Sequence, residues 1–507
     1  MKDGAGYAQR RSVSKVKLKK QICVFLTVWL LAAVPVQAAE PYTNYIYDHN
    51  GQRQEEPQAF RPIGQITGSS LGIGDFSSLE DVCAGADGTV YLADKNNNRI
   101  VVLNAALELK SVLTTFTHDG KTESFSAPAG LFVTKDGRLY VADSGSGRVL
   151  VFDKAGNLLQ TLGRPADRLL DKASDYIPTK VAVDDYGRIY VVAGGVNQGI
   201  VELNNDGSFF AFFGAVSVDT SFAQTVKRLF HSSALENLFT FITTEASIPT
   251  EYSNIDIDEE GFVLGTVSII NANVNVRADQ FIHRLNPKGM DILKRPAVNP
   301  PVGDPVYRNG DGKFITSHLC DIAAGTDGIY SVLDSQEGRI FTYTGEGRLM
   351  YVFGALGTEL GAFGRPTALE RLSDGRYLVT DAEYGTMTVF SPTRYGQVIT
   401  QAVTAYARRD YEQARANWKE ALEYTSSSEL VYDGVADAYF REGDYAAAAE
   451  YYRYSRNHSG YSLAGKYRRS DWIGSHFGTV LGAAAVIAAL IAARLVYRHR
   501  KGGRSHE

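Results

Sequence analysis

Between residues 60 and 392 the chain repeats one pattern of hydrophobic and polar positions. A small or acidic turn with glycine leads into a short aromatic-rich stretch of alternating character, and a second stretch of the same kind follows. Alternation of this kind predicts β-strands. The pattern occurs six times, as DGTVYLAD (87–94), DGRLYVAD (136–143), YGRIYVVA (186–193), EGFVLGTV (260–267), DGIYSVLD (327–334) and DGRYLVTD (374–381).

The turn glycines of the six repeats are spaced by 49, 50, 74, 67 and 47 residues. A period near 50 predicts a four-stranded propeller blade for each repeat. A segment that ends in glycine closes several repeats, and Ile63–Gly68 has the same character, whereas the last repeat ends at Phe390 without one. We therefore predict a mainly β fold, a six-bladed β-propeller, whose sixth blade is completed by the N-terminal strand.

These repeats resemble the NHL repeat of six-bladed propellers, which include bacterial gluconolactonase-like proteins. The resemblance rests on a strand that ends in Asp and a later Arg that opens a Val-rich strand, and it covers about 330 residues. The third and fourth repeats lack this Asp and Arg. We expect architectural ion pairs between residues five positions apart, namely Asp94 with Arg99, Asp143 with Arg148 and Asp334 with Arg339.

The resemblance also indicates where a ligand would bind. In the NHL pattern a glycine commonly stands seven residues before the turn glycine, where the innermost strand begins. Four of the six positions are polar here, and in a propeller they converge on the central channel. Asp81, Asn254 and Asp321 offer hard oxygen ligands for Ca²⁺, another divalent cation or a polyol, and Lys180 could pair with a carboxylate. The six positions hold Asp81, Gly130, Lys180, Asn254, Asp321 and Ala368.

Sugar lactonases of similar fold hold a divalent cation with such side chains, so the resemblance implies a metal-dependent lactonase as one alternative. The cation would polarise the lactone carbonyl and activate water. Alternatively, these four side chains are polar only because the central channel of a propeller is filled with water. The sequence has no zinc motif and its nine histidines form no cluster, which favours a protein without catalytic activity.

Two segments depart from the β pattern. Residues 219–247 have partly helical spacing and predict a helical insert between repeats three and four, which is either a packed structural insert or a lid or partner-binding surface. Residues 398–460 are rich in Ala, Tyr and Glu. Pairs such as Ala414 with Ala448 and Trp418 with Tyr452 lie 34 residues apart, a period that resembles the tetratricopeptide repeat. Two units are visible where about three are usual, so we expect this module to pack against the propeller or a protein partner. The alternative is a rigid spacer between the membrane and the propeller.

Both ends of the chain predict contact with a membrane. A basic stretch, an apolar run and a small-residue site after Ala38 predict a signal peptide over residues 1–38, either cleaved or kept as an anchor. Residues 473–497 predict one transmembrane helix, and the basic residues 498–507 place the C-terminus in the cytoplasm. Gly474, Gly478 and Gly482 recur every four residues, which favours contact with another membrane helix, including a second copy, or simple tolerance of glycine.

Charge narrows the range of partners. Residues 39–493 contain 40 basic and 55 acidic residues, a net charge of −15, and this acidic body argues against binding nucleic acid. Cys83 and Cys320 are the only cysteines of the exported part, and we expect two buried free thiols.

These patterns predict a bacterial single-pass cell-surface protein with a propeller over residues 39–395. We expect a binding or scaffold protein that captures a carbohydrate or cell-envelope ligand in the ring and joins a membrane complex through its helical module. The metal-dependent lactonase is the alternative.

Overall fold

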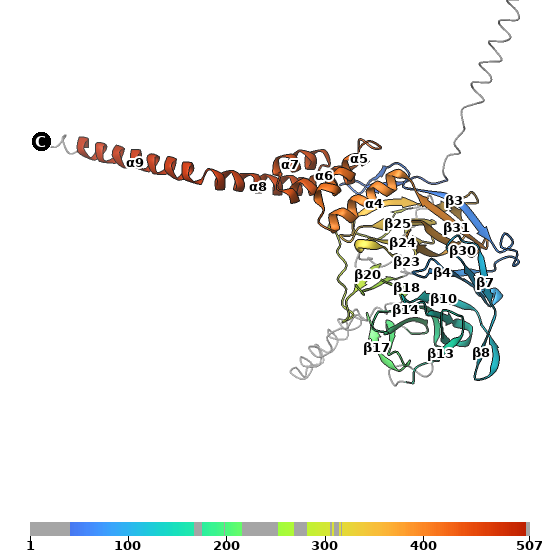
Figure 1. Cartoon of the computed structure of the whole chain (residues 1–507). Helices are drawn as coiled ribbons and strands as arrows, with labels where there is room; N and C mark the ends of the chain where they lie inside the picture. Colours follow the sequence, from blue (N-terminus) through green and yellow to red (C-terminus); the bar gives the residue numbers. More distant parts are fainter. Residues whose placement is uncertain are drawn as a thin grey trace, which may run out of the picture. The chain divides into compact units, whose positions relative to one another are not determined.

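The computed structural model describes residues 41–166, 175–196, 198–214, 252–267, 281–304, 307–308, 314–315 and 317–502. The signal peptide predicted for residues 1–38 and the helical insert predicted for 219–247 lie outside the described residues. Six antiparallel sheets form a six-bladed β-propeller, which confirms the predicted fold class (Figure 1). The innermost strand of each blade contacts that of the next, and the last, β29, contacts the first, β4.

Each blade follows the sequence repeat, with the glycine turn joining its first two strands. The blades comprise β4 (Leu79–Ala84), β5 (Val90–Asp94), β6 (Arg99–Leu103) and β7 (Leu109–Leu113); β10 (Pro128–Val133), β11 (Leu139–Asp143), β12 (Arg148–Phe152) and β13 (Leu158–Leu162); β14 (Ile177–Val183), β15 (Ile189–Gly194), β16 (Ile200–Leu203) and β17 (Phe209–Phe213); β18 (Tyr252–Ile257), β19 (Val263–Val267) and β20 (Ile282–Leu285); β23 (Leu319–Ala324), β24 (Tyr330–Asp334), β25 (Arg339–Tyr343) and β26 (Leu349–Phe353); and β29 (Pro366–Arg371), β30 (Tyr377–Asp381), β31 (Thr386–Pro392) and β3 (Phe60–Thr67).

The ring closes as the sequence predicts. Strand β3, from the start of the described chain, pairs antiparallel with β31 at the end of the last repeat, with Gly64 opposite Val389. The sixth blade is therefore built from both ends of the propeller sequence. Phe60 at the start of β3 is buried and its ring lies 4.7 Å from that of Phe353 in the fifth blade.

Two of the three predicted architectural ion pairs form. Arg99 Nε lies 2.6 Å from Asp94 Oδ2, and Arg148 Nε lies 2.9 Å from Asp143 Oδ2. Each Asp also accepts a backbone N–H from the segment that enters its blade; for Asp94 the donor is Ser77, at 2.8 Å. Each Asp therefore joins the end of its own strand to the loop that precedes the blade.

The third predicted pair, Asp334 with Arg339, is wrong. Arg339 turns instead to Asp304, a buried carboxylate that also receives the hydroxyl of Tyr45 at 2.6 Å and pairs with Arg53 at 2.9 Å. Tyr45 and Arg53 belong to the N-terminal hairpin of β1 (Tyr45–Tyr47) and β2 (Arg53–Glu55), which packs on the fifth blade. Asp304 lies outside the repeat pattern, is held by the hairpin, and takes the place of Asp334 as the partner of Arg339.

The helices α4 (Arg394–Ala407), α5 (Tyr411–Ala421), α6 (Glu429–Glu442) and α7 (Tyr445–Tyr454) form two successive hairpins. The 34-residue spacing reappears in the packing, because Ala414 and Ala448 are both fully buried and Trp418 and Tyr452 are both nearly so. The close approach of α5 to α6 requires Gly434, since a Cβ there would stand 2.3 Å from the indole ring of Trp418.

The first hairpin shares its core with the propeller. One hydrophobic cluster runs from Phe390 and Tyr377 of the sixth blade through Tyr395 and Val398 of α4 to Trp418 of α5. Burial of shared apolar surface is the main force that holds such units together. The predicted packing of the helical module against the propeller is therefore observed.

Charged contacts add to this core. Arg348, in the turn before β26, places Nη2 2.9 Å from Asp433 Oδ2 and Nη1 3.1 Å from Asp437 Oδ2, and both carboxylates are on α6. At a second point, Arg408 after α4 pairs with Asp327 of the propeller at 2.9 Å. The face of α6 that bears Asp433 and Asp437 is thus occupied by the propeller.

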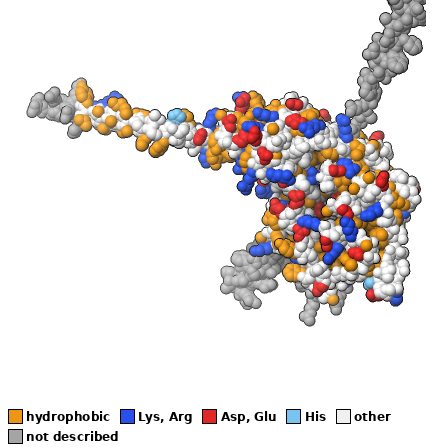
Figure 2. All heavy atoms as spheres, in the orientation of Figure 1, with side chains coloured by type: hydrophobic (Ala, Val, Ile, Leu, Met, Phe, Trp, Pro, Cys, Tyr) orange, Lys and Arg blue, Asp and Glu red, His pale blue; other side chains and the backbone are white. Residues whose placement is uncertain are grey.

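Beyond the hairpins, α8 (His458–Ser475) leads to α9 (Phe477–Gly502). Residues Phe477–Arg498 are long and apolar enough to cross a membrane, with a mean hydropathy of 2.2 and no burial within the structure. Hydrophobic side chains follow α9 in Figure 2. The backbone turns at His476, so Gly474 lies on α8, whereas Gly478 and Gly482 lie on α9.

The two cysteines of the described chain, Cys83 and Cys320, are free, as expected. Cys83 is buried, and Cys320 is partly buried with its thiol 3.6 Å from the carbonyl oxygen of Leu333.

Replacing Asp94 with Asn should lower the free energy of unfolding by about 2 kcal/mol, because Arg99 loses its charged partner. The matched change Asp334→Asn should cost clearly less, since Arg339 pairs with Asp304 there. Chemical denaturation of the full chain measures both values. Equal losses would contradict the assignment of the two arginines.

Replacing Arg348 with Met should loosen α6, because the two carboxyl groups of Asp433 and Asp437 would lose the guanidinium that joins them to the fifth blade. Hydrogen exchange of the α6 amides should become at least tenfold faster, while amides of blade two stay unchanged. Arg376→Met, which removes a pair with the surface residue Asp374 alone, serves as the control. Unchanged exchange in α6 would show that the hydrophobic core alone holds the module.

Candidate functional site

A β-bulge recurs at the start of every innermost strand, and it positions the predicted channel residues. In β4 the register with β5 shifts between Leu79 and Asp81, and in β29 it shifts between Pro366 and Ala368. A bulge re-aims the side chain that follows it. The six residues that follow a bulge form what we call the upper tier, which comprises Asp81, Gly130, Lys180, Asn254, Asp321 and Ala368.

The structure brings the four predicted ligand residues together. Asp81, Lys180, Asn254 and Asp321 come from four different blades, are all buried, and line one cavity of about 620 Å³. The cavity continues past them to the glycine turns of blades two and three, where Asp136 and its neighbours also line it. The cavity therefore extends from the upper tier, which is buried, to the glycine turns at its border.

Lys180 and Asp81 form an ion pair across the channel, with Nζ 2.7 Å from Oδ1. The blade between them contributes Gly130, where a Cβ would stand 2.4 Å from the carbonyl oxygen of Thr179. The glycine is thus required by the close approach of the third blade, and its lack of a side chain leaves the path between the two charges open. Burial favours a lower pKa for Lys180, but the charges of Asp81 and Asp321 raise its pKa overall.

The upper-tier carboxylates also fasten neighbouring blades. Asp81 Oδ2 accepts the backbone N–H of Leu131 in the second blade at 2.7 Å, and Asp321 Oδ2 accepts that of Leu369 in the sixth blade at 2.5 Å. Asn254 Oδ1 accepts the N–H of Ile255 in its own strand at 2.6 Å. The oxygen atoms predicted to bind a metal therefore already accept protein hydrogen bonds, and metal binding by Asp81, Asn254 and Asp321 stays a prediction.

Sequence reasoning missed a second ring of residues, two positions further along each innermost strand. This lower tier includes Asp256 and Glu370, which line the same cavity. Asp256 also joins blades, since its Oδ2 accepts the N–H of Ala324 at 2.7 Å. Alternation along the strand could have revealed them, because residues two apart face the same side. The lower tier comprises Cys83, Phe132, Ala182, Asp256, Ala323 and Glu370.

The two tiers hold four carboxyl groups and one ammonium group. Burial raises the pKa of Asp256 to about 6. Burial also raises the pKa of Asp321 to about 7, although Lys180 acts in the opposite direction. The pKa of Glu370 is raised well above its usual value by burial and then by the charges of Asp256 and Asp321. The channel therefore concentrates carboxyl groups that keep their protons to a higher pH than usual and whose ionised forms a bound cation would stabilise.

The described lining of the cavity contains no histidine and no serine. It offers carboxyl groups for proton transfer, the Lys180 ammonium group and the amide of Asn254, a set suited to hydrogen bonding and charge recognition. The thiol of Cys83 also lines the cavity, and burial raises its pKa, so at neutral pH it is a thiol rather than a thiolate.

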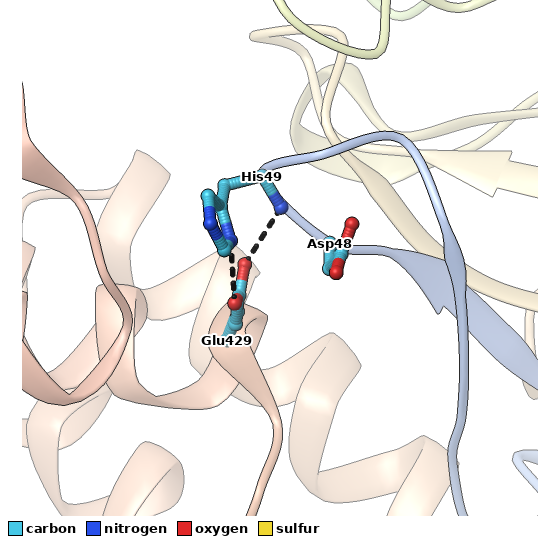
Figure 3. A group of neighbouring side chains, drawn as sticks. All are labelled: Asp48, His49 and Glu429. Atoms are coloured by element: carbon cyan, nitrogen blue, oxygen red, sulfur yellow. Dashed lines mark hydrogen bonds and ion pairs between the residues drawn. The ribbon is translucent and has the colours of Figure 1, made fainter.

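A second group of potential metal ligands lies away from the channel. Among the described residues, three acidic, histidine or cysteine ligand atoms come within 4.8 Å of one another only at Asp48, His49 and Glu429. His49 binds Glu429 through both its ring Nδ1 and its backbone N–H, each at 2.9 Å (Figure 3). Asp48 accepts the N–H groups of Asn50 and Gln52 at 2.8 Å. The contacts of His49 fasten the N-terminal hairpin to the start of α6, and those of Asp48 hold the hairpin loop itself.

Comparison with known proteins agrees with this architecture. Residues 76–103 and 125–152 match the family model of the NHL repeat. The chain is thus a six-bladed β-propeller that carries NHL repeats. No curated protein matches its sequence.

Several solved structures are similar to the chain. A streptogramin B lyase has 13% identity and a TM-score of 0.39, and the match covers 66% of this chain and 98% of the lyase. Virginiamycin B lyase from Staphylococcus aureus has 10% identity and a TM-score of 0.38, with 66% and 99% covered. A protein of unknown function from Bacteroides thetaiotaomicron has 11% identity and a TM-score of 0.39, with 69% and 76% covered.

The buried carboxyl groups predict a pH dependence of stability. An acid whose pKa is raised on folding keeps its proton in the native state while the unfolded chain has released it, so stability falls as pH rises through the native pKa. The Tm of the full chain should therefore fall between pH 5 and pH 8. Groups with a lowered pKa, such as Asp87 and Asp291 at about 2, act below pH 4 and leave this window unaffected.

In Glu370→Gln the fall in Tm across this window should be shallower, because one carboxyl group no longer ionises in the channel. The exposed carboxylate Asp374 provides the control, since Asp374→Asn should leave the slope unchanged. Differential scanning calorimetry measures the slopes. If Glu370→Gln and the parent chain had the same slope, the channel carboxyl groups would not govern this dependence.

Proposed function

We propose that this chain is a membrane-anchored cell-surface binding protein whose propeller captures a ligand in the acidic channel. In this proposal residues 1–38 direct export, α9 spans the membrane, and the basic end of the chain remains in the cytoplasm. The propeller and the helical module form the exported head.

The observation that carries the proposal is the shared core of propeller and helices. A hydrophobic cluster, the contacts of Arg348 and the pair of Arg408 with Asp327 join the two units. The described chain then continues through α8 into the unburied apolar helix α9. The ligand site and the membrane anchor would then belong to one and the same chain, as in a receptor or scaffold protein.

The two helical hairpins support a tetratricopeptide-like role for the module. Their equivalent packing positions lie 34 residues apart, and the same spacing separates Asp410 and Asp444, which cap α5 and α7 by accepting the N–H groups of Gln413 and Ala447. Modules of this kind bind proteins or peptides. We infer that the module contributes a protein-binding surface beside the propeller.

The glycines of the membrane segment support association between helices. A Cβ at Gly478 or Gly482 would have no neighbour within 4 Å, so this surface of α9 is open. Small residues four apart allow two membrane helices to approach closely. Because Gly474 lies on α8, the contact surface of α9 begins with Gly478.

Labelling with a membrane-impermeant maleimide tests the orientation. In a chain whose native Cys23, Cys83 and Cys320 are replaced by Ser, Asp374→Cys should react in intact bacterial cells. Arg498→Cys, at the other end of α9, should react only after lysis. Residues 374 and 498 lie before and after the core of the apolar helix α9. A single pass through the membrane therefore places one cysteine outside the cell and the other in the cytoplasm.

Reaction of Arg498→Cys in intact cells, or protection of Asp374→Cys in them, would contradict the proposed surface display. Fractionation of the same cells provides the control that both variants reach the membrane in equal amounts.

A further inference from the structure

The carboxyl groups of the lower tier have no basic side chain paired with them in the described part of the chain. The Lys180 ammonium group binds Asp81 and lies within electrostatic reach of Asp321, but it belongs to the upper tier. Asp256 and Glu370 of the lower tier form no ion pair with any basic side chain in the described part of the chain. Both face the cavity. Two carboxyl groups thus face a space in which no protein cation meets them.

The upper tier supplies free donors beside these acceptors. Asn254 is only 4% exposed, and its Oδ1 is occupied by the N–H of Ile255. Its amide Nδ2 has no partner among the described residues, although it lines the cavity. The Lys180 ammonium group has three hydrogens, of which Asp81 takes one. Both residues line the cavity, so these donors are available to a ligand with oxygen atoms.

The border of the cavity carries an aromatic ring. Tyr186, in the glycine turn of the third blade, lines the cavity and is 87% exposed. The guanidinium group of Arg188 lies over this ring, 5.9 Å from its centroid, and the exposed remainder of the ring offers a flat apolar surface to a sugar ring. The cavity, of about 620 Å³, lies within the range of about 300–1,000 Å³ that small-molecule sites occupy.

We propose that the channel binds a polyhydroxylated amine, with an amino sugar as the simplest member of this class. The ammonium group of the ligand meets Asp256 and Glu370, its hydroxyl oxygens accept from Asn254 and Lys180, and its ring lies against Tyr186. This assignment rests on the proposed function, because it names the ligand of the same channel.

A divalent metal ion fits this arrangement less well. A metal ion needs several ligand atoms converging on one point. In the described chain such a group of three acidic or histidine atoms occurs at Asp48, His49 and Glu429 and not among the channel carboxylates. The Lys180 ammonium group already lies against Asp81, where a bound cation would be repelled. Separate carboxyl groups around a larger space suit a molecular cation instead.

Isothermal titration of the purified full chain in detergent tests the assignment with three matched sugars. Glucosamine should bind at least tenfold more tightly than glucose or N-acetylglucosamine, which keep the ring and hydroxyls but lack the charge. Glu370→Gln should reduce the affinity for glucosamine at least tenfold. The Gln side chain keeps an oxygen for the backbone N–H of Ala84, which Glu370 accepts in the parent chain. Tyr186→Ala should weaken it several-fold, and Asp374→Asn should leave it unchanged.

Equal binding of the three sugars would overturn the assignment of an amine. Binding of Ca²⁺ that displaces glucosamine or is lost in Glu370→Gln would overturn it in favour of a metal site. Failure of the parent chain to bind glucosamine would also overturn it. The maleimide labelling of intact cells is independent of all these results, so the proposed surface display can stand or fall separately.

Discussion

The pairing of β3 with β31 is the contact on which the rest of the molecule depends. Each propeller sheet buries both faces against its neighbours, so a ring without its last strand would leave the sixth blade incomplete. The same pairing brings Ala59 beside the start of α4, where Thr393 donates its backbone N–H to the carbonyl oxygen of Ala59 at 2.9 Å and caps the helix through its side chain. Closure therefore sets the position of the helical module as well.

The channel shows how one set of side chains can serve both fold and site. Asp81, Asp256 and Asp321 each accept a backbone N–H from the next blade, so the blades are joined by the groups that face the cavity. Burying carboxylates is costly, and the hydrogen bonds and Lys180 offset only part of that cost. A cationic ligand in the channel would offset the rest of that cost.

The sequence predicted those parts of the structure that follow from repetition. Six blades and ring closure follow once the period and the strand alternation are read, and the convergence of Asp81, Lys180, Asn254 and Asp321 follows from the resemblance to the NHL pattern. The pair of Arg99 with Asp94 was predictable for the same reason. Asp256 and Glu370 obey the same alternation and were missed because the family pattern marks one position per strand.

Other features depend on contacts that no repeat encodes. Arg339 turns to Asp304 because the N-terminal hairpin brings Tyr45 and Arg53 to the same carboxylate. Arg348 binds Asp433 and Asp437 because the chain folds α6 back onto the fifth blade. These pairs join segments 35 to 259 residues apart, and residue spacing alone does not indicate such partners.

The contact of Arg348 also restricts how the helical module can bind a protein. The face of α6 that carries Asp433 and Asp437 is filled by the propeller, so a partner would meet other surfaces of the hairpins. Tyr454 of α7 and Tyr461 of α8 are both about half exposed. Tyrosine offers a large rigid surface with a polar end, and it is enriched where proteins meet. A partner that docks there would leave the joint between the propeller and α6 intact, so capture in the channel and assembly at the membrane could proceed together.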